Sequence, residues 1–587
     1  MTWIDWIVLC VTLVSIILYG VWKSRGMRTI ESFLLADRQL PWYHVGLSVM
    51  ATQASAITFI SAPGQGYTDG MRFIQFYFGL PLAMVVLCIT FIPKFKLLNV
   101  FTAYEYLEKR FDNKTRSLTA FLFLLQRGLS TGITIYAPAI ILSTILNIDI
   151  NYTTLLMGGL VIIYTVYGGA KAVSYTQMLQ MGIIFSGLIF AAWMVVHLLP
   201  PEVQFSDALH IAGKMGKMNV IDTKFDLNNK YNLWSGIIGG FFLQLSYFGT
   251  DQSQVGRYLT GRSVAQSRLG LIMNGLVKIP MQFLILMIGV LVFTFYQYHQ
   301  APVFFNKTEV SKIETSAYKA EWQELERTSG TLFKAREQQV NTLIQALHAG
   351  NKGGEDSMRK GLQQTEKQNQ EVRKAAVALL LKNNPRADVN DTNYIFLSFV
   401  TKYLPVGLVG LLIAIIFLAS MGSTASGLNS LASATVIDFY RRLIKPQASA
   451  STYLRASRWS TVGWGLFCIV VAFYAHKLGN LIEAVNILGS LFYGTILGIF
   501  LVAFYMKKVG GTAVFIAALV AEAFIIFAWL TNLMAFLWLN VIGCLVVMVL
   551  AQLIQWGSGA FGSAQAPGED KKASPVIASE ASKYFEN

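Results

Sequence analysis

Residues 48–66 read SVMATQASAITFISAPGQG, and this stretch decides which kind of fold the chain can adopt. The segment is apolar, yet before it closes on Pro63–Gly64 it carries six hydroxyl or amide side chains: Ser48, Thr52, Gln53, Ser55, Thr58 and Ser61. Small and hydroxyl residues allow two membrane helices to pack closely. They also mark broken helices whose freed carbonyls bind an ion at mid-membrane. The segment therefore predicts a membrane-embedded helix that is either tightly packed or broken around an ion.

The rest of the chain repeats the apolar pattern of this segment. Of 587 residues, 54% are hydrophobic and only 13% are charged, whereas a soluble domain carries about 25% charged residues. Apolar runs of about 20 residues match the length of a bilayer-spanning helix, and a single span must satisfy its own backbone hydrogen bonds. We expect an all-α polytopic membrane protein with about 13 transmembrane helices, at residues 3–22, 43–64, 72–93, 117–146, 152–168, 176–199, 233–256, 270–297, 405–437, 459–476, 482–506, 512–531 and 534–555.

The net charge of +15 would suit a nucleic-acid-binding protein if it lay on one surface. Instead, the basic residues gather in alternate loops: Lys23, Arg25, Arg28 and Arg38, six residues between 94 and 116, Arg257, Arg262, Arg268, Arg441, Arg442, Lys445, Arg455, Arg458, Lys507 and Lys508. By the positive-inside rule these loops are cytoplasmic, which puts the N-terminus outside and the C-terminus inside. We expect a multi-pass plasma-membrane protein, such as one of the bacterial inner membrane, with no nucleic-acid partner.

A polar insertion divides the chain. Residues 1–298 contain expected helices one to eight, and residues 393–556 contain helices nine to thirteen. Residues 299–392 are rich in Lys, Glu and Gln, with helical periodicity broken at HAGNKGG (348–354), which predicts a two-helix extracytoplasmic hairpin. This hairpin is either a solvated decoration or a partner or lid element. Residues 557–587 are rich in Gly, Ser, Ala, Pro and charge, and are expected to form a disordered cytoplasmic tail.

The sequence contains no pattern typical of an enzyme. It has no phosphate-binding loop, no HExxH motif, no Gly-rich nucleotide fingerprint and no convincing Ser/His/Asp arrangement. The four cysteines lie inside apolar spans without metal-ligand spacing, so they are expected to be packing residues. We therefore expect neither catalysis nor an organic cofactor.

Two further spans are polar in the manner of residues 48–66. Residues 233–256 contain Gln244 and Asp251 beside Gly249, a candidate breaking point, and residues 405–437 contain a row of Ser, Thr and Asn side chains. Carbonyl and hydroxyl oxygens on facing helices suit a hard cation such as sodium. Three spans of this kind favour a transport path over helix packing alone.

Two cations, Arg127 and Lys278, lie within apolar spans. Each would cost at least about 2.5–3.5 kcal/mol at the centre of a lipid-facing helix, so we expect each to face a protein cavity. The alternative is partial snorkelling to the cytoplasmic interface along the aliphatic stem. A guanidinium offers parallel donors that fit a carboxylate, which makes an organic anion a natural ligand.

Four runs of the chain resemble the sodium:solute symporter family: ESFLLADRQLPWYHVGLSVMATQASAITFISAPGQGY (31–67), YGGAKAVSYTQMLQ (167–180), LSYFGTDQSQVGRYL (245–259) and ASMGSTASGLNSLASATVIDFY (419–440). The resemblance covers nearly all of 1–298 and 393–555. It implies a leucine-transporter-type fold with two inverted repeats of five helices. The repeats would span about 43–199 and about 233–506, with the insertion interrupting the second.

The resemblance also implies a sodium site. In the family this site uses carbonyls of the broken first repeat helix and a carbonyl plus hydroxyls of the eighth, and by motif these fall on Ala51, Ala54, Ala419 and Ser423. The family usually has another hydroxyl where this chain has Gly422, so Thr424 or water would have to replace it.

Some family members bind a second sodium ion. That site uses an aspartate in the motif T-D-x-x-Q, whereas this chain has Thr176, Gln177 and Gln180, and Ala425 replaces a further expected hydroxyl. The resemblance therefore implies one sodium ion per cycle, as the coupling ion and not as a cofactor.

The residues that the resemblance and the polar spans assign to substrate form a mixed set: Gln53, Ser55, Thr58, Tyr77, Arg127, Gln244, Tyr247, Phe248 and Lys278. The first three stand where sialic-acid transporters have Thr, Ser and Thr, and Arg127 stands where those members hold the substrate carboxylate. Tyr77 occupies the place of a sugar-gripping glutamate, and Lys278 matches a lysine of the sugar transporters. Aromatic cover is expected from Tyr247 or Phe248. The set favours a small organic anion over a neutral sugar.

These features predict a sodium-coupled secondary active symporter that imports a small organic solute, such as a monocarboxylate or sialic acid. Sodium would order the broken helix, and rocking of one helix bundle would then expose both ligands inside. Expected partners are the solute, sodium and the lipid bilayer, and the protein is expected to be a monomer or weak dimer. The alternatives are a sodium/sugar symporter, proton coupling because of Gly422, a transporter-like sensor or receptor, and a channel.

Overall fold

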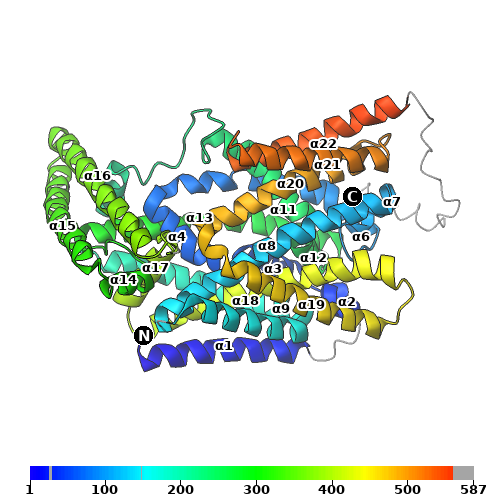
Figure 1. Cartoon of the computed structure of the whole chain (residues 1–587), viewed down its shortest axis with the longest axis horizontal. Helices are drawn as coiled ribbons and strands as arrows, with labels where there is room; N and C mark the ends of the chain where they lie inside the picture. Colours follow the sequence, from blue (N-terminus) through cyan, green and yellow to red (C-terminus); the bar gives the residue numbers. More distant parts are fainter. Residues whose placement is uncertain (25–29, 147, 386, 560–587) are drawn as a thin grey trace.

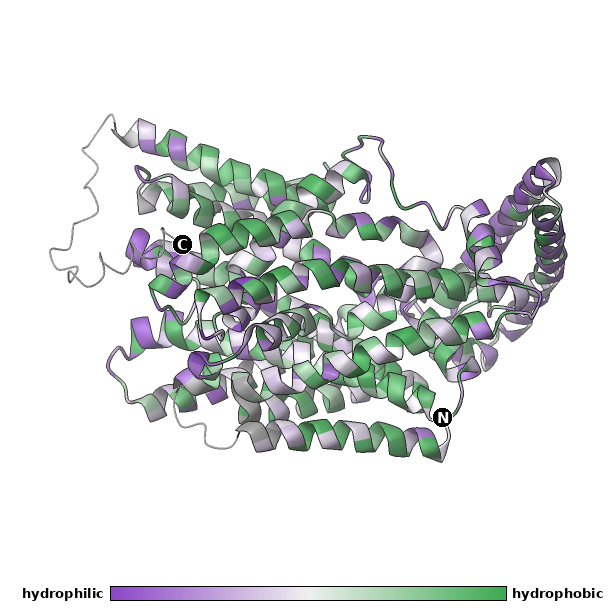
Figure 2. Ribbon diagram, turned by 180° about the vertical axis from the view of Figure 1, so that it is seen from behind, coloured by the Kyte–Doolittle hydropathy of each residue, from purple (hydrophilic) through white to green (hydrophobic). Residues whose placement is uncertain are grey.

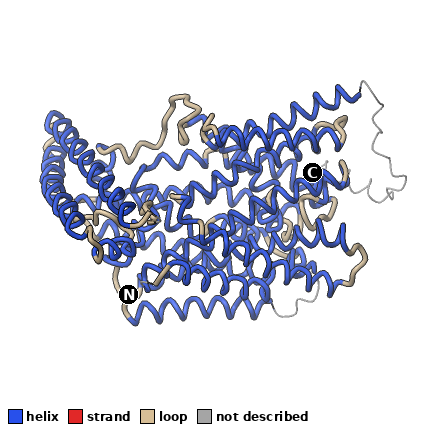
Figure 3. The backbone as a smooth tube through the Cα atoms, in the orientation of Figure 1, coloured by secondary structure: helices blue, strands red, loops and turns tan. Residues whose placement is uncertain are grey.

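The computed structural model describes residues 1–24, 30–146, 148–385 and 387–559, and across these ranges the chain forms helices and loops without a strand (Figure 3). Arg25, Arg28 and residues 560–587, which belong to an expected basic loop and the expected tail, lie outside the described residues. The long helices run roughly parallel to the longest axis of the molecule and form one bundle (Figure 1).

The bundle consists of long helices joined by shorter ones. The long helices and the halves of broken ones are α1 (Trp3–Ser24), α3 (Trp42–Gln53), α4 (Ala56–Asp69), α8 (Asn113–Leu146), α9 (Ile150–His197), α11 (Gly240–Thr250), α12 (Gln252–Tyr258), α13 (Val264–Tyr298), α17 (Thr392–Tyr403), α18 (Leu408–Ala434), α19 (Ala450–Phe473), α20 (Leu481–Tyr505), α21 (Gly511–Leu530) and α22 (Phe536–Gly559). The shorter ones are α2 (Ile30–Leu35), η1 (Ala36–Arg38), η2 (Gly70–Tyr77), α5 (Leu80–Val86), η3 (Leu87–Phe91), α6 (Ile92–Leu97), α7 (Glu105–Arg110), α10 (Phe205–Lys214), η4 (Ser235–Gly239), η5 (Thr435–Ile444) and η6 (Ala475–Leu478).

Ten helical stretches of the described chain are long and apolar enough to cross a membrane. The other expected spans are present in a different form. The span expected at 43–64 is divided between α3 and α4, and α4 continues with the next span as one stretch, Ala56–Leu97. The span expected at 233–256 is divided between α11 and α12, and the one expected at 152–168 is a shorter apolar helix, Ile150–Val166. The described part of the chain thus has ten long apolar stretches instead of the thirteen expected because two spans are broken and one is short, not because spans are missing.

The helix α9 contains two spans that lie side by side. The hydroxyls of Tyr164 and Thr176 are 2.8 Å apart although twelve residues separate them along the chain. Twelve residues of straight helix would cover about 18 Å, so the chain must reverse its direction between these two residues. The apolar stretches Ile150–Val166 and Ala172–His197 are therefore separate crossings, as expected from the sequence.

Two spans are broken near their middles, and these breaks position the functional site. The first lies at Ala54 and Ser55, where both residues leave helical geometry between α3 and α4. The second lies at Asp251, whose extended backbone separates α11 from α12. The polar residues of 48–66 left open whether that span is packed or broken, and the resemblance implied a break. In 233–256 the expected breaking point, Gly249, is wrong: it lies inside α11, and the break comes two residues later at Asp251. By contrast, the polar span at 405–437 forms the unbroken helix α18, continued by η5.

The insertion forms the expected helical hairpin at one end of the bundle (Figure 1). It consists of α14 (Lys307–Glu314), α15 (Lys319–His348) and α16 (Lys352–Asn383), and a small core that includes Trp322 and Leu380 holds it together. The N-terminus lies at the same end as the hairpin, whereas α22 runs to the opposite end (Figure 1). The hairpin is largely hydrophilic and the bundle largely hydrophobic (Figure 2).

Candidate functional site

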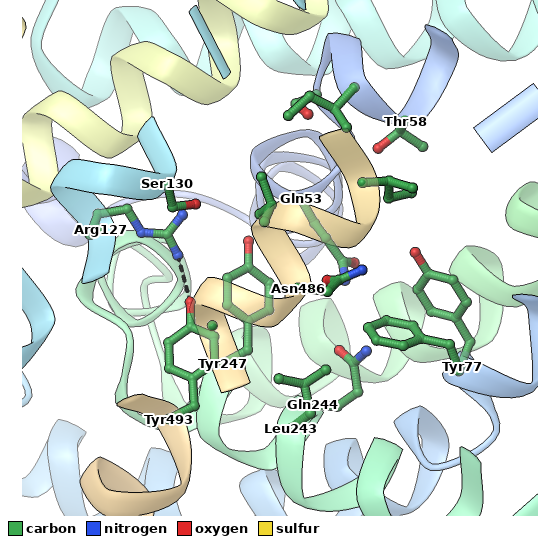
Figure 4. A pocket seen from close by; sticks show the side chains of 16 residues that line it. Gln53, Thr58, Tyr77, Arg127, Ser130, Leu243, Gln244, Tyr247, Asn486 and Tyr493 are labelled. Atoms are coloured by element: carbon green, nitrogen blue, oxygen red, sulfur yellow. Dashed lines mark hydrogen bonds between the residues drawn. The ribbon is translucent and has the colours of Figure 1, made fainter. Parts of the chain in front are cut away.

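A cavity of about 90 Å³ lies beside the break between α3 and α4. Several waters, or a small solute that replaces them, would fill it, since one water needs roughly 10–15 Å³ of such space. We call it the central cavity; Figure 4 shows the side chains that surround it. Its walls come from α3, α4, η2, α8, α11 and α20, and they comprise Gln53, Ser55, Ile57, Thr58, Phe76, Tyr77, Arg127, Ser130, Leu243, Gln244, Tyr247, Ile482, Val485, Asn486, Gly489 and Tyr493.

Most of the residues that the sequence assigned to substrate meet at this cavity. Those that line it are Gln53, Ser55, Thr58, Tyr77, Arg127, Gln244 and Tyr247. The break explains the first three, because it directs consecutive side chains from two helix ends into one space. The aromatic wall expected from Tyr247 or Phe248 is provided by Tyr247, whereas Phe248 is fully buried in the apolar core. Binding of a solute by these residues remains a prediction.

Lys278 is not part of the cavity wall. It is fully buried on α13, and among the described residues its ammonium nitrogen has no hydrogen-bond partner. The ammonium lies 5.8 Å from the centre of the Tyr77 ring, and that ring does line the cavity. Full burial excludes the snorkelling alternative for Lys278. Any influence of this cation on a bound solute would act through Tyr77.

Arg127 lines the central cavity but is already paired with a carboxylate. Its Nη2 donates to Oδ2 of Asp251 and, at 3.0 Å, to the hydroxyl of Tyr493 (Figure 4). The Tyr493 hydroxyl in turn donates to the same Asp251 oxygen at 2.7 Å. The other Asp251 oxygen accepts from the backbone N–H and the hydroxyl of Ser253, at 2.8 and 2.6 Å. The sequence placed both charges in spans without pairing them, and the structure corrects this: they form one buried ion pair.

The guanidinium of Arg127 nevertheless retains donors. Its Nε is buried without a hydrogen-bond partner among the described residues. The ring of Tyr247 lies 5.5 Å from the guanidinium carbon, so an aromatic face also covers the cation. Because a guanidinium has five N–H donors, the Asp251 pair neutralises Arg127 and orients it without exhausting its hydrogen-bonding capacity.

The wall contributed by α20 was missing from the sequence-based site. It consists of Ile482, Val485, Asn486, Gly489 and Tyr493. These positions recur every three or four residues and thus share one helix face. Asn486 was the available signal, since it is a polar side chain inside an apolar span and its amide points into the cavity (Figure 4).

The break between α3 and α4 leaves carbonyl oxygens free. Ser55 N–H donates to Gln53 C=O at 3.1 Å rather than to Ala51, and Thr58 N–H donates to Ser55 C=O at 3.0 Å rather than to Ala54. Consequently, no backbone donor of the described chain reaches the Ala51 or Ala54 carbonyl across the break. These are the two carbonyls that the resemblance assigned to sodium. The helix α18, which carries Ala419 and Ser423, packs against both α3 and α4.

The hydroxyls of α18 have partners within the protein. Ser423 Oγ donates to the Ser420 carbonyl at 3.1 Å, which leaves its oxygen lone pairs available. Thr424 Oγ1 lies 3.2 Å from Thr134 Oγ1 on α8. Thr424 therefore contacts α8. This contact does not support the expectation that Thr424 replaces the hydroxyl missing at Gly422.

A side chain at Gly422 would require the Gln180 side chain to move. A Cβ at this position would lie 2.7 Å from Oε1 of Gln180, which is buried without a hydrogen-bond partner among the described residues. Next to it, the Gln177 amide nitrogen donates to Gly422 C=O, Ser426 Oγ and Thr52 Oγ1, at 3.2, 3.3 and 3.3 Å. In some family members, the resemblance implies that an aspartate and a sodium ion occupy this place. In this chain the Gln177 amide lies among these oxygens instead.

Comparison with known proteins agrees with this arrangement. A family model described as "Sodium:solute symporter family" matches residues 33–318 and 375–521, which leaves most of the hairpin unmatched. The human sodium/iodide cotransporter is 33% identical over 43% of this chain and 40% of its own length. The human sodium-coupled monocarboxylate transporter 1 is 32% identical over 44% of this chain and 42% of its own length. These matches thus span less than half of either human relative.

Longer matches exist at lower identity. The sodium/sialic acid symporter NanT of Aliivibrio fischeri is 25% identical over 94% of this chain and 92% of its own length. A solved structure of a Na⁺-coupled sialic acid symporter in a substrate-bound outward-open state covers 96% of this chain and 99% of its own, with a TM-score of 0.73 and 22% identity. That likeness concerns the fold, which is the all-helical, leucine-transporter-type arrangement expected from the sequence.

Proposed function

Because the chain belongs to the sodium:solute symporter family, we propose that it imports a small organic anion together with sodium. The observation that carries this proposal is Arg127 in the wall of a cavity beside a broken helix. Its pairing with Asp251 removes the cost of an isolated buried charge, while Nε keeps a donor for a second carboxylate. The solute carboxylate would bind this remaining edge, with Tyr247 covering the cation.

The proposed sodium site consists of the Ala51, Ala54 and Ala419 carbonyls and Ser423 Oγ. Its support is the pair of unengaged carbonyls at the first break and the packing of α18 against both halves of that helix. An ion there would tie the broken helix to α18 and so favour one arrangement of the two bundles. The inward sodium gradient would supply about 2.3 kcal/mol per charge for each 100 mV of membrane potential. We propose one sodium ion per cycle, since the Gln177 amide lies among the oxygens that a second ion would need.

We also propose the orientation. The hairpin and the N-terminus lie at one end, whereas α22 runs to the other (Figure 1). With the basic loops in the cytoplasm of a bacterial cell, the hairpin would stand outside the inner membrane. A cysteine placed at Arg327, which is exposed on α15, tests this assignment. It should react with a membrane-impermeant maleimide on intact spheroplasts, and reaction only after lysis would reverse the assignment.

Uptake into proteoliposomes tests the function. Radiolabelled monocarboxylates and sialic acid should accumulate only with an inward sodium gradient. Arg127→Lys keeps the positive charge but loses the parallel N–H donors of the guanidinium, so it should lower kcat/KM for uptake by at least about tenfold. Lys402→Arg, a charge-conserving change at the outer end of α17, serves as the matched control. Uptake that persists without sodium would refute the coupling, and equal uptake by both variants would refute the role of Arg127.

A sugar is the second candidate because three amides, Gln53, Gln244 and Asn486, line the same cavity and suit hydroxyl groups. Glucose and galactose therefore form the second arm of the uptake assay. Sodium-dependent sugar uptake that is insensitive to Arg127→Lys would favour the sugar over the anion.

A further inference from the structure

A second cavity of about 150 Å³ lies between the hairpin and the end of the bundle that it covers. We call it the hairpin cavity. Its floor is the end of α4, at Tyr67 and Thr68, with Lys217 and Phe293 beside them, and its roof is formed by α15 and α16. Most of that roof lies outside the residues that match the family model. The cavity is therefore a feature that the membership of the family does not account for.

The charges lining the hairpin cavity do not balance. It is lined by three cations, Lys217, Arg336 and Arg373, and by one carboxylate, Glu366. Arg373 donates to Asp391 at 2.7 Å, outside the lining, and is thereby neutralised. The remaining two cations share Glu366, which lies 4.0 Å from Arg336 at its nearest. Within the lining, Arg336 thus has one distant carboxylate and Lys217 has none at ion-pair distance among the described residues.

Arg336 has donors that its long ion pair with Glu366 does not use. It is only 6% exposed, and its Nη2 donates to a neutral acceptor, the Tyr296 carbonyl, at 2.8 Å. Its Nε is buried without a hydrogen-bond partner among the described residues. By contrast, the buried Arg116 at the opposite end of the bundle bonds to both Asp438 and Glu108. A buried guanidinium left with donors to spare is a site that an anion would stabilise.

Lys217 points to the same conclusion. Its ammonium donates to the Thr68 carbonyl and lies 4.8 Å from the centre of the Phe293 ring. Among the described residues it forms no ion pair, and Glu366 and Asp69 act on it only from a greater distance. Burial lowers the pKa of Lys217 below its usual value. An anion in the cavity would offset that effect, since an opposite charge favours the ionised form.

Part of the cavity wall is apolar. Phe293, Leu332 and Phe333 line it, with Phe293 beside Lys217 and Phe333 beside Arg336, and α16 adds amides and one hydroxyl. A cavity with two cations and an aromatic wall suits an anion that carries an apolar body, whereas a bare halide would leave that wall without a contact.

We propose that the hairpin cavity binds a small carboxylate with an apolar body, as a first station for the transported solute. The inference rests on the proposed function, because it assigns the same class of anion to both cavities. The helix α4 connects them: Thr58 lines the central cavity and Thr68 the hairpin cavity, ten residues or about 15 Å along one helix. Residence in the hairpin cavity would raise the local concentration of solute at the end of α4 and would join that helix to the hairpin.

The test measures benzoate binding in a protein whose central cavity cannot hold an anion. The background is the full chain with Arg127→Gln and Asp251→Asn, which removes both charges of the central pair, and calorimetry in nanodiscs at constant sodium reports the affinity. This background should still bind benzoate. Adding Arg336→Gln should weaken benzoate binding by about tenfold or more, since it removes a charge-assisted interaction. Adding Arg327→Gln, an exposed position on the same helix, should leave it unchanged.

A background that does not bind benzoate, or equal affinity with Arg336→Gln and Arg327→Gln, would overturn the inference. Sulfate is the comparison for an inorganic anion, and tighter binding of sulfate than of benzoate would also overturn it. Lys217→Gln is the second variant, because Arg336 anchors the hairpin to Tyr296 and its loss could loosen the fold; it should weaken benzoate binding as well. If the proposed function were wrong, uptake would fail in the wild-type protein while benzoate binding to the background remained.

Discussion

The two broken helices of this protein, α3/α4 and α11/α12, treat their exposed backbone in opposite ways. At the first break, the Ala51 and Ala54 carbonyls receive no donor across the gap. At the second, the Thr250 carbonyl accepts from the Tyr104 hydroxyl at 2.9 Å, and the Asp251 carbonyl accepts from the N–H groups of Gln254 and Val255 at 3.0 and 2.9 Å. The first break leaves the Ala51 and Ala54 carbonyls to a ligand, whereas the second satisfies the Thr250 and Asp251 carbonyls within the protein.

The charges follow the same division. The first break carries neutral side chains, Gln53 and Ser55, so a cation is the natural partner for its free carbonyls. The second carries Asp251, which caps α12 through Ser253 and neutralises Arg127 on α8. In the two expected repeats the breaks thus differ: we propose that one binds the coupling ion, whereas the other holds the cation in the wall of the central cavity.

The largest expected effect comes from the second break. Asp251→Asn keeps the shape of the side chain but leaves Arg127 buried without a carboxylate. Breaking a buried ion pair by removing one partner costs about 3–5 kcal/mol, so the melting temperature should fall markedly and uptake should be lost. Thermal unfolding of the purified protein in detergent, followed by intrinsic fluorescence, provides the measurement.

The double variant Arg127→Gln with Asp251→Asn is the matched control for that prediction. It removes both charges, so most of the lost stability should return while uptake of an anion stays absent. A single variant as stable as the wild type would show that the second break does not depend on the pair, and the contrast between the breaks would then be lost.

An intermediate effect is expected next to the first break. Gly422→Ser restores the hydroxyl that the family usually has, but its Cβ would meet Gln180 Oε1 at 2.7 Å. Overpacking of this kind costs about 1–3 kcal/mol, so the single variant should be less stable and should need more sodium for uptake. Pairing it with Gln180→Ala should relieve the contact and lower the sodium requirement below that of the wild type.

Gly182→Ser is the control for that change, because a Cβ there meets nothing within 4 Å. Its stability and sodium dependence should match the wild type. If Gly422→Ser were equally silent, Gln180 would not be the reason for the glycine, and the absence of a hydroxyl beside the first break would remain unexplained.

The sequence predicted the site best where polar side chains interrupt an apolar run. Gln53, Ser55, Thr58 and Arg127 were found in this way, because lipid does not tolerate such side chains and the chain must turn them inward. Tyr493 was missed, since an aromatic residue in an apolar span has no distinctive signal. Lys278 was assigned to the solute by position in its span, but packing of α13 places it behind Tyr77.

Pairings between distant spans lay beyond the sequence for a different reason. Arg127 and Asp251 are 124 residues apart, and only the packing of α8 against the second break brings them together. The hairpin shows the same limit: periodicity predicted its two helices, but not that they would cover the end of α4 and enclose a cavity. Local composition determines which residues turn inward, whereas the partner of each residue depends on how the helices pack.

The smallest predicted effect concerns the proposed sodium site beside the first break. Ser423→Ala removes one proposed sodium ligand from α18 while leaving the free carbonyls of the first break intact. Ser430→Ala is its matched control, since Ser430 also bonds to a carbonyl three residues back on the same helix, at 2.7 Å, and is also buried. The sodium concentration for half-maximal uptake should rise about tenfold in Ser423→Ala, which corresponds to about 1.4 kcal/mol, and should not change in Ser430→Ala. Because neither variant alters a charge, a shared response would reflect helix packing, and only a difference between the two assigns the ion to the first break.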